Sequence, residues 1–211
     1  MRQNMKQKLY LIASASLTKG RPLEAVVREA AAGGVDIVQL REKNSTAFDV
    51  YSMALKLKEV LREFPNVLFL INDRVDVAMA VGADGVHLGQ VSLPLKTVRG
   101  LLGDEKIIGV STHNIEEAER AQREGADYII FSHIFETKSK PGLVPKGIEV
   151  LSEIKARIKV PIFALGGINI TNVHKVLNVG VDNIAVMSAI LESPDPRKTA
   201  LQLKNKIKGV V

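Results

Sequence analysis

The chain has 211 residues, of which 46% are hydrophobic and 25% are charged, and this composition is typical of a globular protein with a sizeable core. It contains no cysteine, which excludes a disulfide framework, a thiolate nucleophile and a cysteine-ligated zinc site. No apolar run approaches the ~20 residues of a membrane span, and the N-terminus is not typical of a signal peptide. We therefore expect a cytoplasmic protein that has no membrane partner.

The formal net charge is +6, but the lysines are dispersed along predicted helices, aromatic residues make up only 4% and there is no tryptophan. A nucleic-acid-binding surface would gather basic residues in one patch, with aromatic residues for stacking. The pattern therefore favours solvated helix faces over a nucleic-acid partner. A phosphorylated small molecule would also suit a basic cavity mouth.

Strand-like and helix-like segments alternate along the whole chain, joined by short connections. The strands are continuous apolar runs, as expected when both faces of a parallel sheet are buried. We predict strands at residues 8–14, 35–41, 67–71, 85–88, 106–111, 128–134, 161–165 and 183–187. We predict helices at residues 22–32, 46–64, 74–81, 94–102, 114–124, 147–158, 172–179 and 196–209.

An internal repeat supports a closed arrangement of these units. A Gly-x-Asp tripeptide begins at Gly34, Gly82, Gly125 and Gly180, each time directly before an even-numbered strand. Each glycine is expected to end a helix, and each aspartate to begin the turn into the strand. We therefore predict a single (β/α)8 TIM barrel that forms one domain over residues 1–211. The alternative is an open doubly wound sheet, although no G-x-G-x-x-G motif follows the first strand.

The active site of a TIM barrel lies at the C-terminal ends of its strands. Small residues follow the last two strands here: Gly166 and Gly167 after the seventh, and Met187 and Ser188 at the eighth. The loops after these strands commonly hold a phosphate through backbone N–H groups and a helix N-terminus. We predict a phosphate site there; the alternative is that the glycines only make a tight turn.

Charged residues follow the second and third strands, and Asp84 lies directly before the fourth. Arg41 and Lys43 could pair with phosphate oxygens. Asp73 and Asp84 could hold Mg²⁺ together with water and phosphate, since Mg²⁺ usually takes one or two carboxylates. The alternative for Asp84 is the turn role of the repeated aspartates.

His133 ends the sixth strand, just before a polar loop with Thr137, Ser139 and Lys140. A histidine at this position could do acid/base chemistry on an anion; the alternative is a core histidine with satisfied hydrogen bonds. Two other histidines at strand ends have no partner at metal-ligand spacing and are interpreted as polar packing or cavity lining: His87 and His113.

Six segments in order resemble the thiamine-phosphate synthase superfamily across the whole chain. They are VQLREK (38–43), INDR (71–74), GADGVHLGQ (82–90), GVSTH (109–113), ALGGI (164–168) and AVMSAI (185–190). The resemblance implies one of two activities. Synthases join a hydroxymethylpyrimidine diphosphate to a thiazole phosphate with Mg²⁺, whereas thiazole tautomerases aromatise a thiazole carboxylate phosphate without a metal.

The segment after the sixth strand is similar to the tautomerase motif G-H-x-F-E-T, because it reads Ser132-His133-Ile134-Phe135-Glu136-Thr137. Both prolines of the synthase motif G-P-I-F-P-T-x-T-K are missing. The resemblance therefore implies a tautomerase, an isomerase with no cofactor, in which His133 is the catalytic acid/base. Its partner would be a phosphorylated thiazole, and a homo-oligomer is left open.

The other segments match the synthases. They carry the residues that synthases use for the pyrimidine diphosphate and Mg²⁺: Gln39, Arg41, Lys43, Asn72, Asp73, Asp84, Gln90, Ser111 and Lys140. Thr137 and Ser139 match the two threonines of the synthase loop. The first alternative is therefore a thiamine-phosphate synthase with Mg²⁺, and the second is a regulatory binder of thiazole or thiamine phosphates without turnover.

Overall fold

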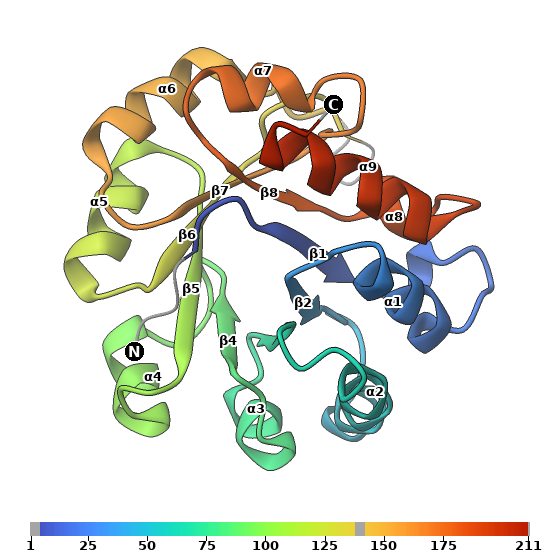
Figure 1. Cartoon of the computed structure of the whole chain (residues 1–211). Coiled ribbons are helices and arrows are strands. Elements are labelled where there is room, and N and C mark those ends of the chain that lie inside the picture. Colours follow the sequence, from blue (N-terminus) through green and yellow to red (C-terminus); the bar gives the residue numbers. More distant parts are fainter. Residues whose placement is uncertain (1–4, 138–141, 211) are drawn as a thin grey trace.

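The computed structural model describes residues 5–137 and 142–210, and Figure 1 shows its strands in the middle with helices around them. All neighbouring strands are parallel, and β8 pairs with β1 to close the barrel. The strands are β1 (Leu9–Ala13), β2 (Ile37–Leu40), β3 (Leu68–Asn72), β4 (Gly85–Leu88), β5 (Ile107–Thr112), β6 (Tyr128–Ser132), β7 (Ile162–Leu165) and β8 (Asn183–Val186). The helices are α1 (Leu23–Ala32), α2 (Ala47–Leu61), α3 (Val75–Val81), α4 (Leu95–Leu102), α5 (Ile115–Glu124), α6 (Gly147–Arg157), α7 (Val173–Asn178), α8 (Ser188–Leu191) and α9 (Pro196–Lys208), with a 3-10 turn η1 (Ala15–Leu17).

The predicted (β/α)8 barrel is confirmed, and the open doubly wound sheet is wrong. The organisation of residues 1–211 as one domain stays a prediction. Two elements are missing from the prediction, η1 after β1 and α8 after β8. They have three and four residues, and a segment of that length is too short to show a helical period.

Side-chain caps set where two of the outer helices begin. The Thr46 hydroxyl accepts the Asp49 N–H, and the Asp49 carboxylate accepts the Thr46 N–H in return, which forms a capping box for α2. The Asn114 side chain accepts the Glu117 N–H at 2.8 Å at the start of α5. These caps satisfy N–H groups that the helices themselves leave unpaired.

The Gly-x-Asp repeat builds the turns at the N-terminal end of the barrel. Gly82 and Gly125 end α3 and α5 in the left-handed conformation, with φ of 61° and 92°. Three of the repeated aspartates accept a backbone N–H from the preceding strand at 2.7 to 2.8 Å: Asp36 from Leu9, Asp84 from Phe69 and Asp127 from Ile108. At these three places the repeat therefore joins an even strand to the odd strand before it, at the N-terminal end of the barrel.

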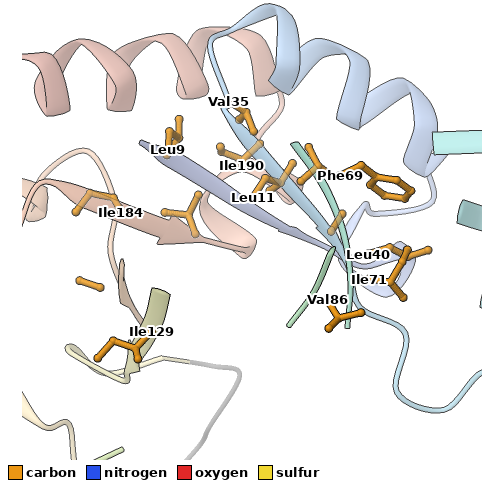
Figure 2. Close-up of a cluster of buried hydrophobic side chains, with 14 of the residues drawn as sticks. Leu9, Leu11, Val35, Leu40, Phe69, Ile71, Val86, Ile129, Ile184 and Ile190 are labelled. Atoms are coloured by element: carbon orange, nitrogen blue, oxygen red, sulfur yellow. The ribbon is translucent and has the colours of Figure 1, made fainter. Parts of the chain in front are cut away.

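Side chains alternate between two cores along each strand. Leu9 and Leu11 point outwards under the helices, where they join a large apolar cluster that also includes Val86 and Ile190 (Figure 2). Inward-pointing residues form a second cluster inside the barrel, dominated by the rings of Tyr10, Tyr128 and Phe163. Gly109 makes room for this ring layer, since a Cβ there would lie 2.0 Å from the Tyr128 ring. The inner cluster forms the floor beneath the strand ends.

Candidate active site

The C-terminal strand ends open into a cavity of about 720 Å³, to which every strand contributes lining residues. The structure brings most of the predicted site residues together on its wall: Gln39, Arg41, Lys43, Asn72, Asp73, Ser111, His133, Thr137, Gly166, Gly167, Met187 and Ser188. Two predicted site residues lie outside the described residues: Ser139 and Lys140. The roles of the predicted residues stay predictions.

Asp84 does not line this cavity, and its contacts correct the prediction that it binds a metal ion. It lies directly before β4, at the opposite end of the barrel, where its carboxylate accepts the Phe69 N–H at 2.7 Å. Its backbone N–H in turn donates to the Phe69 carbonyl at 2.8 Å. Asp84 is therefore one of the repeated turn aspartates.

Cationic side chains lie on the β2 side of the cavity. Arg41 is half-buried, and burial lowers the pKa of its guanidinium while the neighbouring Glu42 raises it. Glu42 is turned away towards η1, where it accepts the Ala15 N–H at 2.6 Å. Within residues 5–137 and 142–210, neither Arg41 nor the exposed Lys43 forms a salt bridge. An arginine always carries its charge in proteins, so this guanidinium is available to an anion.

Asp73 lies beside this cationic side, in the left-handed conformation with φ of 63°. Its backbone N–H donates to the His87 carbonyl at 2.9 Å, which fixes the loop after β3 against β4. Its carboxylate is exposed and makes no hydrogen bond or salt bridge to any other described residue. The adjacent Arg74 pairs with Asp76 instead. The described residues contain no cluster of three or more metal-binding side chains.

Two glycines line the opposite side of the cavity, after β7. Gly166 and Gly167 have φ of 109° and 65°, and a Cβ on Gly167 would lie 2.3 Å from the Glu136 carbonyl oxygen. This close approach shows that Gly167 also makes room for the segment after β6. Ser188 begins α8 at the same side, and the first N–H groups of a helix have no partner within it. The arrangement fits the predicted phosphate site.

His133 is a buried wall residue, 4% exposed, and follows a cis peptide bond after Ser132. Its Nε2 lies 3.3 Å from the Leu143 carbonyl oxygen, and its own carbonyl accepts the Lys146 N–H at 2.9 Å. Its Nδ1 has no hydrogen-bond partner among the residues that the structure describes. His133 therefore contacts the part of the chain that leads into α6, at Leu143 and Lys146.

A buried row of polar side chains separates the cavity from the inner core, and the sequence prediction included only part of it. Tyr10 donates to Gln39 Oε1 at 2.7 Å, and Gln39 Nε2 donates to Asn72 Oδ1 at 2.8 Å. Tyr10 also lies 3.0 Å from the Tyr128 hydroxyl. Burial raises the pKa of both tyrosines, so both hydroxyls stay protonated. The missed signal is position: both tyrosines occupy inward-facing positions on their strands.

His87 continues this row towards β5. Its Nδ1 lies 3.1 Å from the Tyr128 hydroxyl, its Nε2 lies 2.8 Å from Ser111 Oγ, and its ring stacks on Tyr128. Burial, with a smaller contribution from the charge of Arg41, lowers the pKa of His87 to about 3. The imidazole is therefore neutral, and the prediction of polar packing or cavity lining describes its position.

The fold and the cavity define a (β/α)8-barrel protein with a partly cationic cavity at the C-terminal strand ends. Within this class, the chain belongs to the family described as thiamine monophosphate synthase, which matches residues 9–190. The predicted superfamily is thereby confirmed. No helix of the described residues is long and apolar enough to cross a membrane.

Curated relatives match along nearly the full length. The chain is 44% identical over 201 residues to the thiamine-phosphate synthase of Clostridium tetani, covering 95% of this chain and 96% of that protein. It is 40% identical over 206 residues to the enzyme of the same name from Methanobrevibacter smithii, covering 98% of each. The solved structure of thiamine phosphate pyrophosphorylase from Pyrococcus furiosus superposes with a TM-score of 0.87 at 38% identity, covering 97% of each chain.

These relatives contradict the prediction that the chain is a thiazole tautomerase and an isomerase, because they are named as synthases. The prediction gave one short segment, residues 132–137, more weight than the matching segments at the other strand ends. A single loop is the part of a barrel that varies most freely, whereas the strand ends build the cavity together.

Proposed function

We propose that this chain is a thiamine-phosphate synthase, a transferase that joins hydroxymethylpyrimidine diphosphate to thiazole phosphate. The names of its full-length relatives support this proposal. So does the size of the cavity, about 720 Å³, because cavities of roughly 300–1,000 Å³ are usual for small-molecule ligands.

The observation that carries the proposal is that two groups of residues suited to binding anions line one cavity at different strand ends. Arg41 and Lys43 lie at the end of β2, while Gly166, Gly167 and Ser188 lie after β7 and β8. A guanidinium and an ammonium suit the larger charge of a diphosphate. Bare backbone N–H groups at a helix start suit a single phosphate. One cavity can therefore hold both substrates with their anionic groups apart.

A magnesium ion fits the residues present on the diphosphate side. Mg²⁺ is usually bound by one or two carboxylates together with substrate phosphates and water. Asp73 offers an exposed carboxylate that makes no hydrogen bond or salt bridge to another described residue, and it lines the same cavity as Arg41 and Lys43. When bound there, Mg²⁺ would supply positive charge to the leaving diphosphate. Asp84 has no part in this site.

The reaction breaks the bond between the pyrimidine methylene carbon and the diphosphate oxygen, and the diphosphate leaves with the bonding electron pair. The thiazole nitrogen then donates its lone pair to the methylene carbon, which forms the new C–N bond. Arg41 and Lys43 stabilise the charge that develops on the leaving oxygen. The two anion-binding places orient the two rings so that the thiazole nitrogen faces the methylene carbon, which lowers the entropic part of the barrier. On the resemblance, Lys140 also neutralises charge at the diphosphate, and Thr137 and Ser139 take the places of the two threonines of the synthase loop.

The test is an assay of thiamine phosphate formation from the two substrates, with Mg²⁺ or with EDTA. We expect coupling with Mg²⁺ and none with EDTA. Asp73→Ala should lower kcat/KM by roughly 10²-fold or more, because it removes the protein's carboxylate from the metal. Ligand binding without coupling under any of these conditions would overturn the proposal.

Asp84→Ala is the matched control. It removes the same charge at the N-terminal end of the neighbouring strand β4, outside the cavity. Its loss leaves the Phe69 N–H without its side-chain acceptor, so we expect a stability decrease of about 1 kcal/mol. Its kcat/KM and its Mg²⁺ requirement should stay at the wild-type values. Equal kinetic losses in the two variants would contradict the assignment of Asp73.

A further inference from the structure

The hydrogen bonds of the buried polar row under the cavity all run in one direction, from donor to acceptor. The row links β3 to β5 through six side chains: Asn72, Gln39, Tyr10, Tyr128, His87 and Ser111. Each hydroxyl has one proton, and a neutral imidazole has one ring proton. Fixing one bond therefore fixes the next.

The amide of Gln39 sets the direction at one end. Its Nε2 donates to Asn72 Oδ1 at 2.8 Å, so its Oε1 accepts the Tyr10 hydroxyl proton at 2.7 Å. Tyr10 then has no proton left for Tyr128, 3.0 Å away, and can only accept from it. The Tyr128 proton is in turn committed to Tyr10.

The direction then passes through His87. Since the Tyr128 hydroxyl has given its proton to Tyr10, it accepts a proton from His87 Nδ1 at 3.1 Å. The neutral ring has no second proton, so Nε2 accepts the hydroxyl proton of Ser111 at 2.8 Å. His87 is buried between two hydroxyls, and no carboxylate contacts its ring within the described part of the chain.

We propose that the direction of this hydrogen-bonded row fixes Asn72 as a hydrogen-bond donor and Ser111 as an acceptor towards the ligand. Tyr10 and Tyr128 are then positioning residues. The Asn72 oxygen is taken by Gln39, which leaves its amide N–H groups for the cavity. The Ser111 proton is taken by His87, which leaves its oxygen lone pairs. The matching ligand is a heteroaromatic ring with an acceptor nitrogen and an N–H donor, as an aminopyrimidine has. This inference rests on the proposed function for the identity of that ring.

The hydrogen-bonded row can reverse only as a whole, because a flipped Gln39 amide would invert the direction of every hydrogen bond after it. The tautomer of His87 therefore reports the direction: a proton on Nδ1 for the proposed direction, and on Nε2 for the reverse. Two-bond ¹H–¹⁵N spectra of protein labelled with ¹⁵N-histidine distinguish these forms. The chain has four histidines, and His87→Gln identifies the signal to be read.

The decisive variant is Tyr10→Phe. Tyr10 makes no hydrogen bond to His87 itself, but its hydroxyl is the acceptor of the Tyr128 proton, and the variant removes that acceptor. Tyr128 can then donate to His87 Nδ1, so we expect the His87 proton to move, wholly or in part, to Nε2. Ser111 would then present a proton to the ligand. KM for the pyrimidine diphosphate should rise roughly ten- to hundredfold, the effect of one mispaired polar group in the site. KM for the thiazole phosphate should stay within about twofold.

Phe163→Leu is the matched control, because Phe163 packs against both tyrosine rings and has no polar side-chain atom. It should lower stability yet leave the His87 tautomer and both KM values unchanged. An Nε2 proton in the wild type, or an unchanged tautomer in Tyr10→Phe, would overturn the proposal. If the protein shows no coupling activity, the proposed function fails. The tautomer of His87 still supports or overturns the proposed direction of the hydrogen bonds in the row.

Discussion

At the scale of single residues, His87 is the buried polar group whose charge state matters most for stability. It is 3% exposed, and both of its ring nitrogens face hydroxyl groups. A hydroxyl can accept from or donate to a neutral ring, but it cannot neutralise an imidazolium. The folded state therefore binds a proton at His87 far less readily than the unfolded chain does.

We predict that the protein loses stability as the pH falls, and that the protonation of His87 causes this loss. The pKa of His87 is about 3 in the folded state and 6.5 when unperturbed, so only the unfolded state gains the proton between these values. The free energy of unfolding should fall through this window, by on the order of 5 kcal/mol at most. Urea unfolding at a series of pH values should show a flatter dependence for His87→Gln.

His174→Gln is the control for this measurement, because His174 is exposed on α7. It should keep the wild-type dependence on pH. The same slope in His87→Gln as in the wild type would show that His87 does not carry this part of the stability.

Most residues of the candidate site could be predicted because parallel strands bring their C-terminal ends to one edge. Arg41, Asp73 and Ser111 lie at or just after the C-terminal ends of strands whose apolar runs are clear in the sequence. Asp84 precedes its strand, as the other repeated aspartates do, so it lies at the opposite end of the barrel and has the turn role that the repeat predicted as the alternative. The roles of Tyr10 and Tyr128 could not be predicted, since they depend on which inward-facing side chains meet across the barrel.

At the scale of elements, the short helix α8 determines how the phosphate side of the cavity is built. It has four residues, Ser188–Leu191, and starts directly where β8 ends. Arg21 holds its far end by donating to the Leu191 carbonyl at 2.6 Å. Its sequence gives no helical period, so the prediction placed Ser188 at the end of a strand and did not include a helix.

A negative charge at the start of α8 should exclude a phosphate while leaving the helix intact. We predict that Ser188→Asp raises KM for the thiazole phosphate about tenfold or more, since two negative charges would share one place. An aspartate is favourable near a helix N-terminus, so the fold should be preserved. Affinity for the dephosphorylated thiazole, measured by calorimetry, should change little.

Thr171→Asp serves as the control for this variant. It adds the same charge on an exposed residue of the neighbouring loop that does not line the cavity. We expect it to leave both affinities near the wild-type values. If Ser188→Asp weakened the phosphorylated and dephosphorylated ligands equally, the start of α8 would not be the phosphate site.

At the scale of the whole molecule, the cavity exists only when the barrel is closed. Every strand supplies part of its lining, and the last strand must pair with the first to bring β8 and β2 to the same mouth. The alternation of strands and helices and the Gly-x-Asp repeat predicted this closure from sequence. The partners that meet across the barrel could not be predicted, because the register between strands is a property of the closed sheet.

Ligands that bind this cavity should therefore stabilise the closed barrel as a unit. With the pyrimidine diphosphate and Mg²⁺ at about 100 times the dissociation constant, we predict a rise in Tm of roughly 5–10 °C. EDTA should remove most of that rise, because the metal and Asp73 bind the diphosphate together. Thiazole phosphate should raise Tm by itself, with or without EDTA, since its place is made of backbone groups. Arg41→Gln should reduce the first shift and leave the second, whereas loss of both shifts in this variant would show that the two anions do not occupy separate places.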